Sequence, residues 1–340
     1  MSTTAEQVRA WKGPAVLSFG FRPFFLGGAV WAAVAMALWV PMLSGHLVLP
    51  TAFDPVSWHA HEFLFGYLGA IVAGFLMTAV PNWTGRMPVV GWPLAGLFGL
   101  WLAGRIAVAF AVYLPVLAVA AADLAMAVVL AAFIAREIAA GRNWRNLPVL
   151  AALAALIIGN GIFHWEAASG AYAAQGYGLR LGLAAALMMI ALVGGRIVPS
   201  FTRNWLVKRG GSALPAPPMQ RFDKLALAVL LVALLLWIVR PQAETTGVAL
   251  MLAGLLHLVR LMRWRGGRTV REPLVWVLHA GYLFLPLGTL GLGADLILPG
   301  AVGMAAAQHL WMAGAIGVMT MAVMTRASLG HTGRPLTAGP

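Results

Sequence analysis

Two histidines, His61 and His309, stand in matching surroundings 248 residues apart. The same offset aligns the small residues that follow each of them: Gly66 with Gly314, Gly69 with Gly317, and Thr84-Gly85-Arg86 with Thr332-Gly333-Arg334. Each histidine lies in a long apolar stretch, where its desolvation must be offset by a partner. Two matched histidines suggest the two axial ligands of one flat metal cofactor, and haem is the first candidate.

The composition predicts the elements that must position these histidines. Of the 340 residues, 61% are hydrophobic and 10% charged, and the mean hydropathy of +0.86 lies outside the range of soluble proteins. A helix needs about 20 residues to cross a bilayer. Ten apolar stretches qualify: 24–44, 58–80, 92–112, 114–135, 147–168, 177–199, 223–239, 245–263, 273–294 and 302–325. They lack the alternation of a barrel, so we expect an all-α polytopic bundle.

The loop charges predict the orientation of this bundle. Every Lys and Arg except Arg105, Arg180 and Arg240 lies before the first span or beside a loop that follows an even-numbered span. The positive-inside rule therefore places both termini in the cytoplasm and explains the net charge of +13. Because the basic residues are spread over alternate loops, nucleic acid is excluded as a partner.

The expected parts of the chain follow from the same pattern. No short apolar core with a cleavage site precedes Phe24, so residues 1–23 are expected to form an interfacial segment and not a cleavable signal. The bundle is expected over 24–326, and a cytoplasmic tail over 327–340.

The absence of cysteine narrows the cofactor chemistry. It excludes Fe–S ligation, thiolate-bound haem and covalent c-type haem. Histidine, methionine and carboxylate remain as metal ligands, and histidine suits haem iron and copper. Any haem here would be held without a covalent bond.

Four histidines are expected toward the outer face: His59, His61, His164 and His309. In a regular helix His59 and His61 would point about 200° apart, so they would serve two sites, or one would serve none. Gly66 would let a planar macrocycle lie close to the backbone. Hydrogen bonding between helices is the open alternative for a single intramembrane histidine such as His164.

Arg180 opens the sixth span at the outer face. The propionates of a haem between His61 and His309 would emerge there, and a guanidinium could pair with them. Snorkelling of Arg180 to the interface is equally consistent with its position.

The sixth span carries a weaker echo of the second. Pro199-Ser200-Phe201-Thr202 resembles Pro81-Asn82-Trp83-Thr84 at an offset of 118, which sets Leu179 where His61 would be. Spans two, six and ten would then correspond in three four-helix units, as in the haem-copper oxidase fold, by fold analogy only. Gly178 and Gly182 match a small-xxx-small pattern, which favours close helix contact.

Four sequence blocks resemble the NnrS family: Phe21-Arg22-Pro23-Phe24-Phe25, Trp58-His59-Ala60-His61-Glu62, Gly195-Arg196-Ile197-Val198-Pro199-Ser200-Phe201-Thr202-Arg203-Asn204 and Thr325-Arg326-Ala327-Ser328-Leu329-Gly330-His331-Thr332-Gly333-Arg334. That family comprises bacterial inner-membrane proteins that contain haem and copper and are associated with the response to nitric oxide. The resemblance covers essentially the whole chain. Family members usually carry more spans, so ligands from later spans would be missing here.

The resemblance implies one or two haem b groups, copper as a further cofactor, and a role in withstanding nitric oxide. We expect a haem b bound by His61 and His309, with His59 and His164 available to a second haem or to copper. A haem iron with one histidine has an open position for nitric oxide or another small diatomic ligand. Nitric oxide would be detoxified or sequestered; reductive chemistry would need an electron donor that the sequence does not identify. Membrane lipid surrounds the bundle.

Two other functions stay open. A haem-copper oxidoreductase resembling a nitric oxide reductase would require three convergent histidines for copper. A transporter would use broken helices and polar residues near the midplane, for which Asn160, Asp123, His257 and His279 are candidates.

Overall fold

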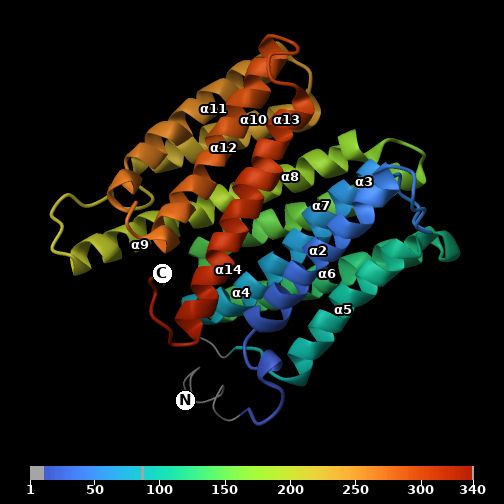
Figure 1. Cartoon of the computed structure of the whole chain (residues 1–340), viewed down its shortest axis with the longest axis horizontal. Helices are drawn as coiled ribbons and strands as arrows, with labels where there is room; N and C mark the ends of the chain where they lie inside the picture. The colour runs from blue at the N-terminus through green and yellow to red at the C-terminus, as the bar shows by residue number, and fades with distance from the viewer. Residues whose placement is uncertain (1–10, 86–87, 339–340) are drawn as a thin grey trace. The chain divides into compact units, whose positions relative to one another are not determined.

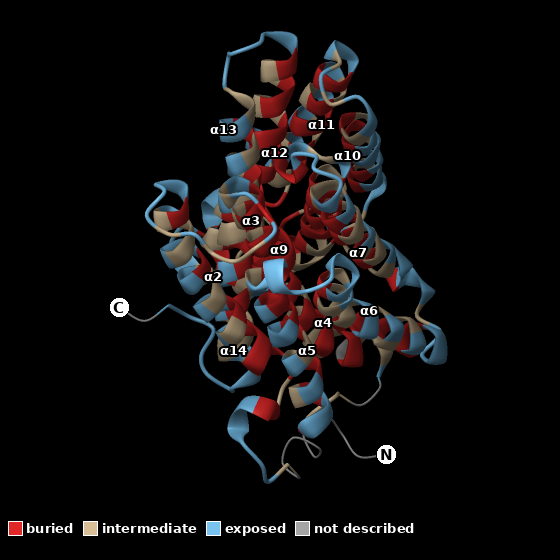
Figure 2. Ribbon diagram, turned by 90° about the vertical axis from the view of Figure 1, so that its right-hand side faces the viewer, coloured by how far each residue is buried: buried red, intermediate tan, exposed pale blue. Residues whose placement is uncertain are grey.

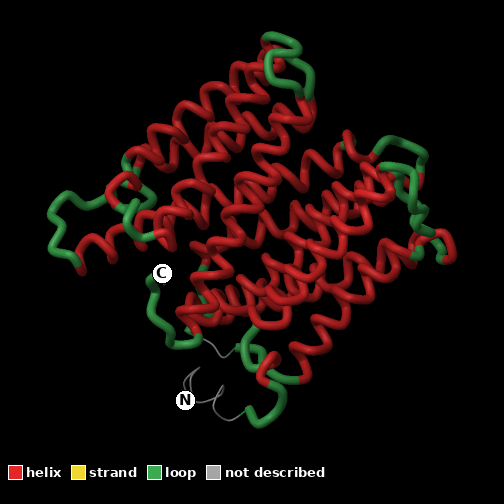
Figure 3. Tube along the Cα trace, in the orientation of Figure 1, coloured by secondary structure: helices red, strands yellow, loops and turns green. Residues whose placement is uncertain are grey.

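The computed structural model describes residues 11–85 and 88–338. Within these residues the regular structure is helical, and no strand occurs (Figure 3). Ten helical spans are long and apolar enough to cross a membrane, which confirms the prediction of an all-α multi-pass membrane protein. Arg9, Arg86 and the ends of the predicted terminal segments, 1–10 and 339–340, lie outside the described residues.

The chain divides into two compact units, Met1–Gly182 and Leu183–Pro340, here called unit 1 and unit 2. The helices of unit 1 are α2 (Phe21–Leu43), α3 (Pro55–His61), the π-helical η2 (Glu62–Tyr67), α4 (Leu68–Thr84), α5 (Trp92–Ala109), α6 (Val116–Ala140) and α7 (Leu147–Ala168), followed by the first part of α8 (Tyr177–Met189). Helix α4 packs on α2 and α6, and α6 also packs on α5 and α7 (Figure 1).

Unit 2 takes up the rest of α8 and, within the described residues, eight further α- or π-helical segments: the π-helical η6 (Ile190–Gly194), α9 (Gly195–Lys208), α10 (Arg221–Val239), α11 (Glu244–Met262), α12 (Pro273–Ile297), α13 (Met304–His309), the π-helical η8 (Leu310–Val318) and α14 (Met319–His331). Short 3-10 turns connect the longer helices: Ala15–Leu17, Ala111–Tyr113, Trp144–Asn146, Ala173–Gln175 and Gly266–Arg268. Helix α12 is central, because α11, η8, α13 and α14 all pack against it.

The helices present apolar faces to lipid as well as to the core. On α2 the exposed residues Leu26, Val30 and Val34 repeat every four positions and form one apolar face. In each unit the buried residues line the faces where helices meet, while the loops are exposed (Figure 2). An apolar residue on the outside is expected where the surroundings are lipid.

Glycines bring α7 and α8 into direct backbone contact in unit 1. A Cβ atom on Gly159 would come within 2.8 Å of the backbone nitrogen of Gly182, and one on Gly178 within 2.4 Å of the backbone nitrogen of Phe163. The predicted close contact of a helix at Gly178 and Gly182 is therefore confirmed. This contact fixes the position of α7, which carries His164, along the axis of α8.

The second and tenth spans share a break in their helical pattern. In the second span α3 ends at His61 and η2 begins at Glu62; in the tenth α13 ends at His309 and η8 begins at Leu310. The π segments thus start at equivalent positions of the 248-residue offset, which supports the internal repeat. The sixth span also has a π segment, but η6 starts at Ile190, ten residues later than Glu62 plus 118. The sixth span therefore repeats the presence of a π segment but not its position.

Two helices extend furthest past the ends that the apolar pattern predicts. The sixth span was expected to end at 199, but α9 continues to Lys208, and the tenth was expected to end at 325, but α14 continues to His331. Helical hydrogen bonds do not require apolar side chains, so a helix can continue past the membrane boundary. With 32 residues, the sixth span rises about 48 Å, well beyond a hydrocarbon core of about 30 Å.

A buried polar network joins the helices of unit 2. The guanidinium of Arg260 donates from Nε to Asp223 Oδ1 at 2.8 Å and from Nη1 to the Tyr282 hydroxyl at 2.9 Å. Nδ1 of His257 lies 2.8 Å from the same hydroxyl, and its Nε2 lies 3.2 Å from the carbonyl of Ala226. Because Nε2 donates to that carbonyl, Nδ1 must accept from Tyr282. His257 therefore joins helices by hydrogen bonds, the open alternative to ligation.

Candidate metal centre

Three loops of unit 1 meet at one end of its helices, the end assigned to the outer face. They are residues 44–54, 110–115 and 169–176. The backbone N–H of Val112 donates to the carbonyl of Pro50 at 3.1 Å, and that of Ala174 donates to Ser57 Oγ at 3.2 Å. Residues of different helices that lie close to these loops are therefore at a similar depth in the unit.

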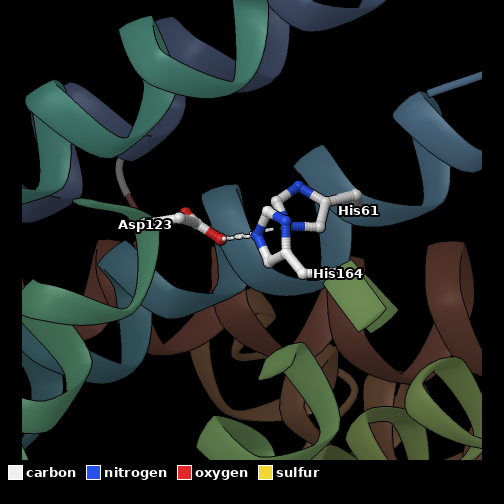
Figure 4. Close-up of side chains that lie close together, drawn as sticks. All are labelled: His61, Asp123 and His164. Carbon is white, nitrogen blue, oxygen red and sulfur yellow. Dashed lines mark hydrogen bonds and ion pairs between the residues drawn. The ribbon is translucent and has the colours of Figure 1, made fainter. Parts of the chain in front are cut away.

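His61, Asp123 and His164 meet below these loops, each within about 10 Å of helix rise from its helix end. Nε2 of His61 lies 3.1 Å from Asp123 Oδ2, and Nε2 of His164 lies 3.0 Å from the same oxygen (Figure 4). One ligand atom from each residue lies within 4.8 Å of the others, and all three residues are buried. This group, called the His–Asp–His cluster, can hold a metal ion.

Asn160 fixes the orientation of the cluster. Its Nδ2 donates to Asp123 Oδ2 at 2.8 Å, so its Oδ1 is the atom that faces His61 Nε2, at 3.0 Å. Asn160 and His164 are four residues apart on α7 and therefore project from the same helix face. Asp123 Oδ2 thus receives contacts from α3 and α7, two helices besides its own.

Glu62 and Arg105 form the polar side of the cluster. Arg105 donates from Nη1 to Glu62 Oε2 at 2.6 Å and from Nη2 to Asp123 Oδ1. Glu62 Oε2 also accepts from Trp31 Nε1 at 2.7 Å, and Glu62 Oε1 lies 3.1 Å from His61 Nδ1. Each of these carboxylate oxygens therefore has a partner, as a buried charge requires.

The contacts of His61 call for one more cation. Its Nδ1 faces Glu62 and its Nε2 faces Asp123 and Asn160 Oδ1, all of them acceptors. A neutral imidazole carries one N–H and cannot donate on both sides. With neutral histidines, two carboxylates and Arg105 leave a net charge of −1. A second proton on His61 resolves both the contacts and the charge. A metal ion at Nε2 also resolves the contacts, and it neutralises the cluster if monovalent and leaves a net charge of +1 if divalent.

The local sequence explains how His61 and Glu62 both point inward. Asp54 caps α3 by accepting from the backbone N–H groups of Val56 and Ser57 at 3.0 Å, and Pro55 follows at the first helical position. The helix changes to the wider π form at Glu62, directly after His61. Such π segments are frequent at functional sites. Here two consecutive side chains are fully buried.

The two aligned glycines accommodate protein side chains. A Cβ atom on Gly66 would come within 2.5 Å of Arg105 Nη1, and one on Gly314 within 2.4 Å of the Phe284 ring. The space beside Gly66 is taken by Arg105 in this structure, and the expectation that Gly66 borders a planar macrocycle on the His59 face stays a prediction. The ligand atoms of His61, Asp123 and His164 lie within 4.8 Å of one another, a spacing that suits a small ion.

Two other predicted site residues, His59 and Arg180, make contacts outside the cluster. His59 points away from His61 and stacks on Trp39 with ring centroids 4.0 Å apart, as the two-residue spacing predicts. Arg180 donates to the carbonyl of Gln175 at 2.5 Å and lies over the ring of Tyr177, a placement that fits an interfacial anchor. Its contact with a propionate stays a prediction.

His309 is exposed, in unit 2. Its Nδ1 lies 2.7 Å from the carbonyl of Ala305, one turn earlier. Because only a protonated Nδ1 can donate to a carbonyl, the lone pair of the neutral ring lies on Nε2. This tautomer leaves Nε2 as the ring nitrogen with a lone pair for a metal. The sharing of one haem by His61 and His309, which belong to different units, stays a prediction.

Sequence reasoning found part of this site. His61 and His164 were expected as metal ligands, and the structure brings them together. Asp123 was considered only as a midplane polar residue, and Glu62 and Arg105 were given no role. A signal was available: Arg105 and Asp123 lie close to the two ends of one short loop, 110–115, so that a buried pair between neighbouring spans could have been predicted.

Comparison with known proteins gives one family. The model of the family described as NnrS protein matches residues 15–340. Neither the curated proteins nor the solved structures contain a match to the chain. The match spans nearly the whole chain, and the protein therefore belongs to the NnrS family, which is linked to the nitric oxide response.

Proposed function

We propose that this member of the NnrS family holds a copper ion between His61, Asp123 and His164 and takes up nitric oxide there. The observation that carries the proposal is the buried cluster that lacks one positive charge. Two imidazole nitrogens and a carboxylate oxygen suit copper among the first-row metals. Bound copper would supply an open coordination position for nitric oxide and a one-electron redox couple.

The residues around the ion would orient and shield it. Glu62 accepts the Nδ1–H of His61 and so directs the Nε2 lone pair toward Asp123, an arrangement common for metal-bound histidine. Arg105 holds both carboxylates in place. The rings of Phe53, Phe65 and Phe163, all within 5.4 Å of the His61 ring, keep water from the other side.

We further propose His309 as a haem ligand, because its Nε2 is available and its side chain is exposed. A haem b shared with His61 receives less support, since both ring nitrogens of His61 already have partners. The bacterial inner membrane with both termini in the cytoplasm is the proposed location, on the basis of loop charge.

Electron paramagnetic resonance of the copper(II)-loaded protein tests the proposal. We expect a signal with hyperfine coupling to two imidazole nitrogens in the wild type, and its loss when nitric oxide is added. A His164→Ala variant should lose the coupling to one nitrogen. A wild-type signal that does not respond to nitric oxide would contradict the proposed uptake even if copper is bound.

The alternative to a metal ion in the cluster is a second proton on His61. A cluster that holds a proton in place of a metal would favour a transporter as the second candidate function. The described residues bring two histidines and not three to the cluster, which argues against a three-histidine copper site of the haem-copper type. If copper fails to bind and substrate-dependent uptake is found in haem-free protein, the transporter is favoured.

A further inference from the structure

We infer that Phe53, carried by the outer loop, closes the His–Asp–His cluster and restricts access to small uncharged ligands entering from the outer face. This inference rests on the proposed metal centre. It assigns to one side chain the control over what reaches the ion and how fast the ion exchanges.

Phe53 points into the unit from an otherwise exposed stretch. Its neighbours Ala52 and Asp54 are exposed, whereas Phe53 is 9% exposed. The Phe53 ring lies 5.0 Å from the ring of His61 and 5.5 Å from that of His164. It therefore covers both histidine ligands at once.

The wall that Phe53 completes is aromatic. Phe163 lies 5.3 Å from the His61 ring and meets Phe53 edge-on at 5.4 Å, and Phe65 lies 5.4 Å from His61. Phe65 belongs to η2 and Phe163 to α7, so helical hydrogen bonds hold both in place. Phe53 belongs to a loop and is the member of this wall that can move without breaking a helix.

The loop is tied on both sides of Phe53. The carbonyl of Pro50 accepts from Val112, and the carboxylate of Asp54 caps α3. These anchors hold the backbone on both sides of Phe53, so that outward movement of the ring requires only rotation of its side chain. Together they give Phe53 the properties of a closing residue: a fixed base and a movable ring.

The surroundings define the ligands that pass. The polar side of the cluster is occupied by Arg105 and Glu62, so the route over Phe53 runs along aromatic carbon. A charged or chelating molecule would have to lose its water there without a hydrogen-bonding partner. A diatomic molecule of low polarity meets no such cost, so the wall selects for small uncharged ligands.

The rate at which EDTA removes copper(II) from the loaded full-length protein tests the inference. Phe53→Ala should lose copper about tenfold faster than the wild type, with unchanged copper content before EDTA is added. Phe53→Leu, which keeps apolar bulk, should lie between them. Phe24→Ala is the control, because Phe24 is also a buried phenylalanine of unit 1 but packs on Phe98 away from the cluster.

The outcomes separate the two claims. Copper that leaves Phe53→Ala and Phe53→Leu no faster than it leaves the wild type and Phe24→Ala would overturn the closing role and leave the metal centre intact. A wild type that retains no copper before EDTA is added would overturn the proposed function, and the inference with it. Melting temperatures of both Phe53 variants near that of the wild type would show that faster loss does not come from unfolding.

Discussion

Buried charge governs the chemistry around His61. A carboxylate in an apolar interior is costly unless it is paired and hydrogen-bonded, and Glu62 and Asp123 share Arg105 for this purpose. On the proposed assignment, a cation compensates the single negative charge that remains. We therefore predict that stability and ion binding are coupled at this site.

Removing an oxygen ligand should weaken copper binding more than removing the carboxylate that orients His61. We expect Glu62→Gln to lower copper affinity by about 10–100-fold, the range for partners of metal-bound histidine, and Asp123→Asn to lower it further. A competition titration with a chelator of known affinity measures both. His46→Ala, at an exposed loop residue, serves as the control, and a Glu62→Gln affinity equal to the wild type would refute the orienting role.

Arg105→Gln should destabilise the ion-free protein by about 3–5 kcal/mol, because two buried carboxylates lose their partner. Adding a divalent ion should recover part of that loss, since the ion replaces the missing positive charge. Thermal unfolding in detergent, with and without copper, measures both effects. The exposed Arg240→Gln is the matched control; an Arg105→Gln protein as stable as this control would rule out the coupling.

At the scale of the elements, close helix contact determines where the ligands lie. Gly159→Ala should destabilise the protein by about 1–3 kcal/mol, because its Cβ would meet the backbone of α8. On the same helix, a Cβ on Gly161 has its nearest neighbour at 3.9 Å, in Leu124, so that Gly161→Ala should be tolerated. The melting temperatures of the two variants test this difference, and equal melting temperatures would refute the role of the close contact at Gly159.

Some elements could be predicted from the sequence and others could not. The positions of the ten spans were predictable, because length and apolarity are visible in the sequence and the membrane demands helices. The π segments after His61 and His309 were not, since the change from α to π hydrogen bonding leaves no mark in composition. The full length of α9 was not predicted, because a search for apolar residues does not detect a basic helix outside the lipid.

At the scale of the whole molecule, the charge of the loops predicts the topology, and the absence of cysteine makes it easy to test. In the otherwise cysteine-free chain, Ala52→Cys and Ala171→Cys should react with a membrane-impermeant maleimide from the outer side, because both positions are exposed in loops assigned to that side. Gly210→Cys should react only after the membrane is opened. Labelling in the reverse pattern would invert the assigned orientation.

The copper content of the purified, copper-loaded protein tests the central claim most directly. His59 and His164 form a matched pair, because both were expected as ligands and only His164 lies in the cluster. We predict close to one copper per chain in the wild type and in His59→Ala, and a clear loss in His164→Ala. A wild type without copper, or a His164→Ala variant that retains as much as the wild type, would contradict a metal ion held by His61, Asp123 and His164.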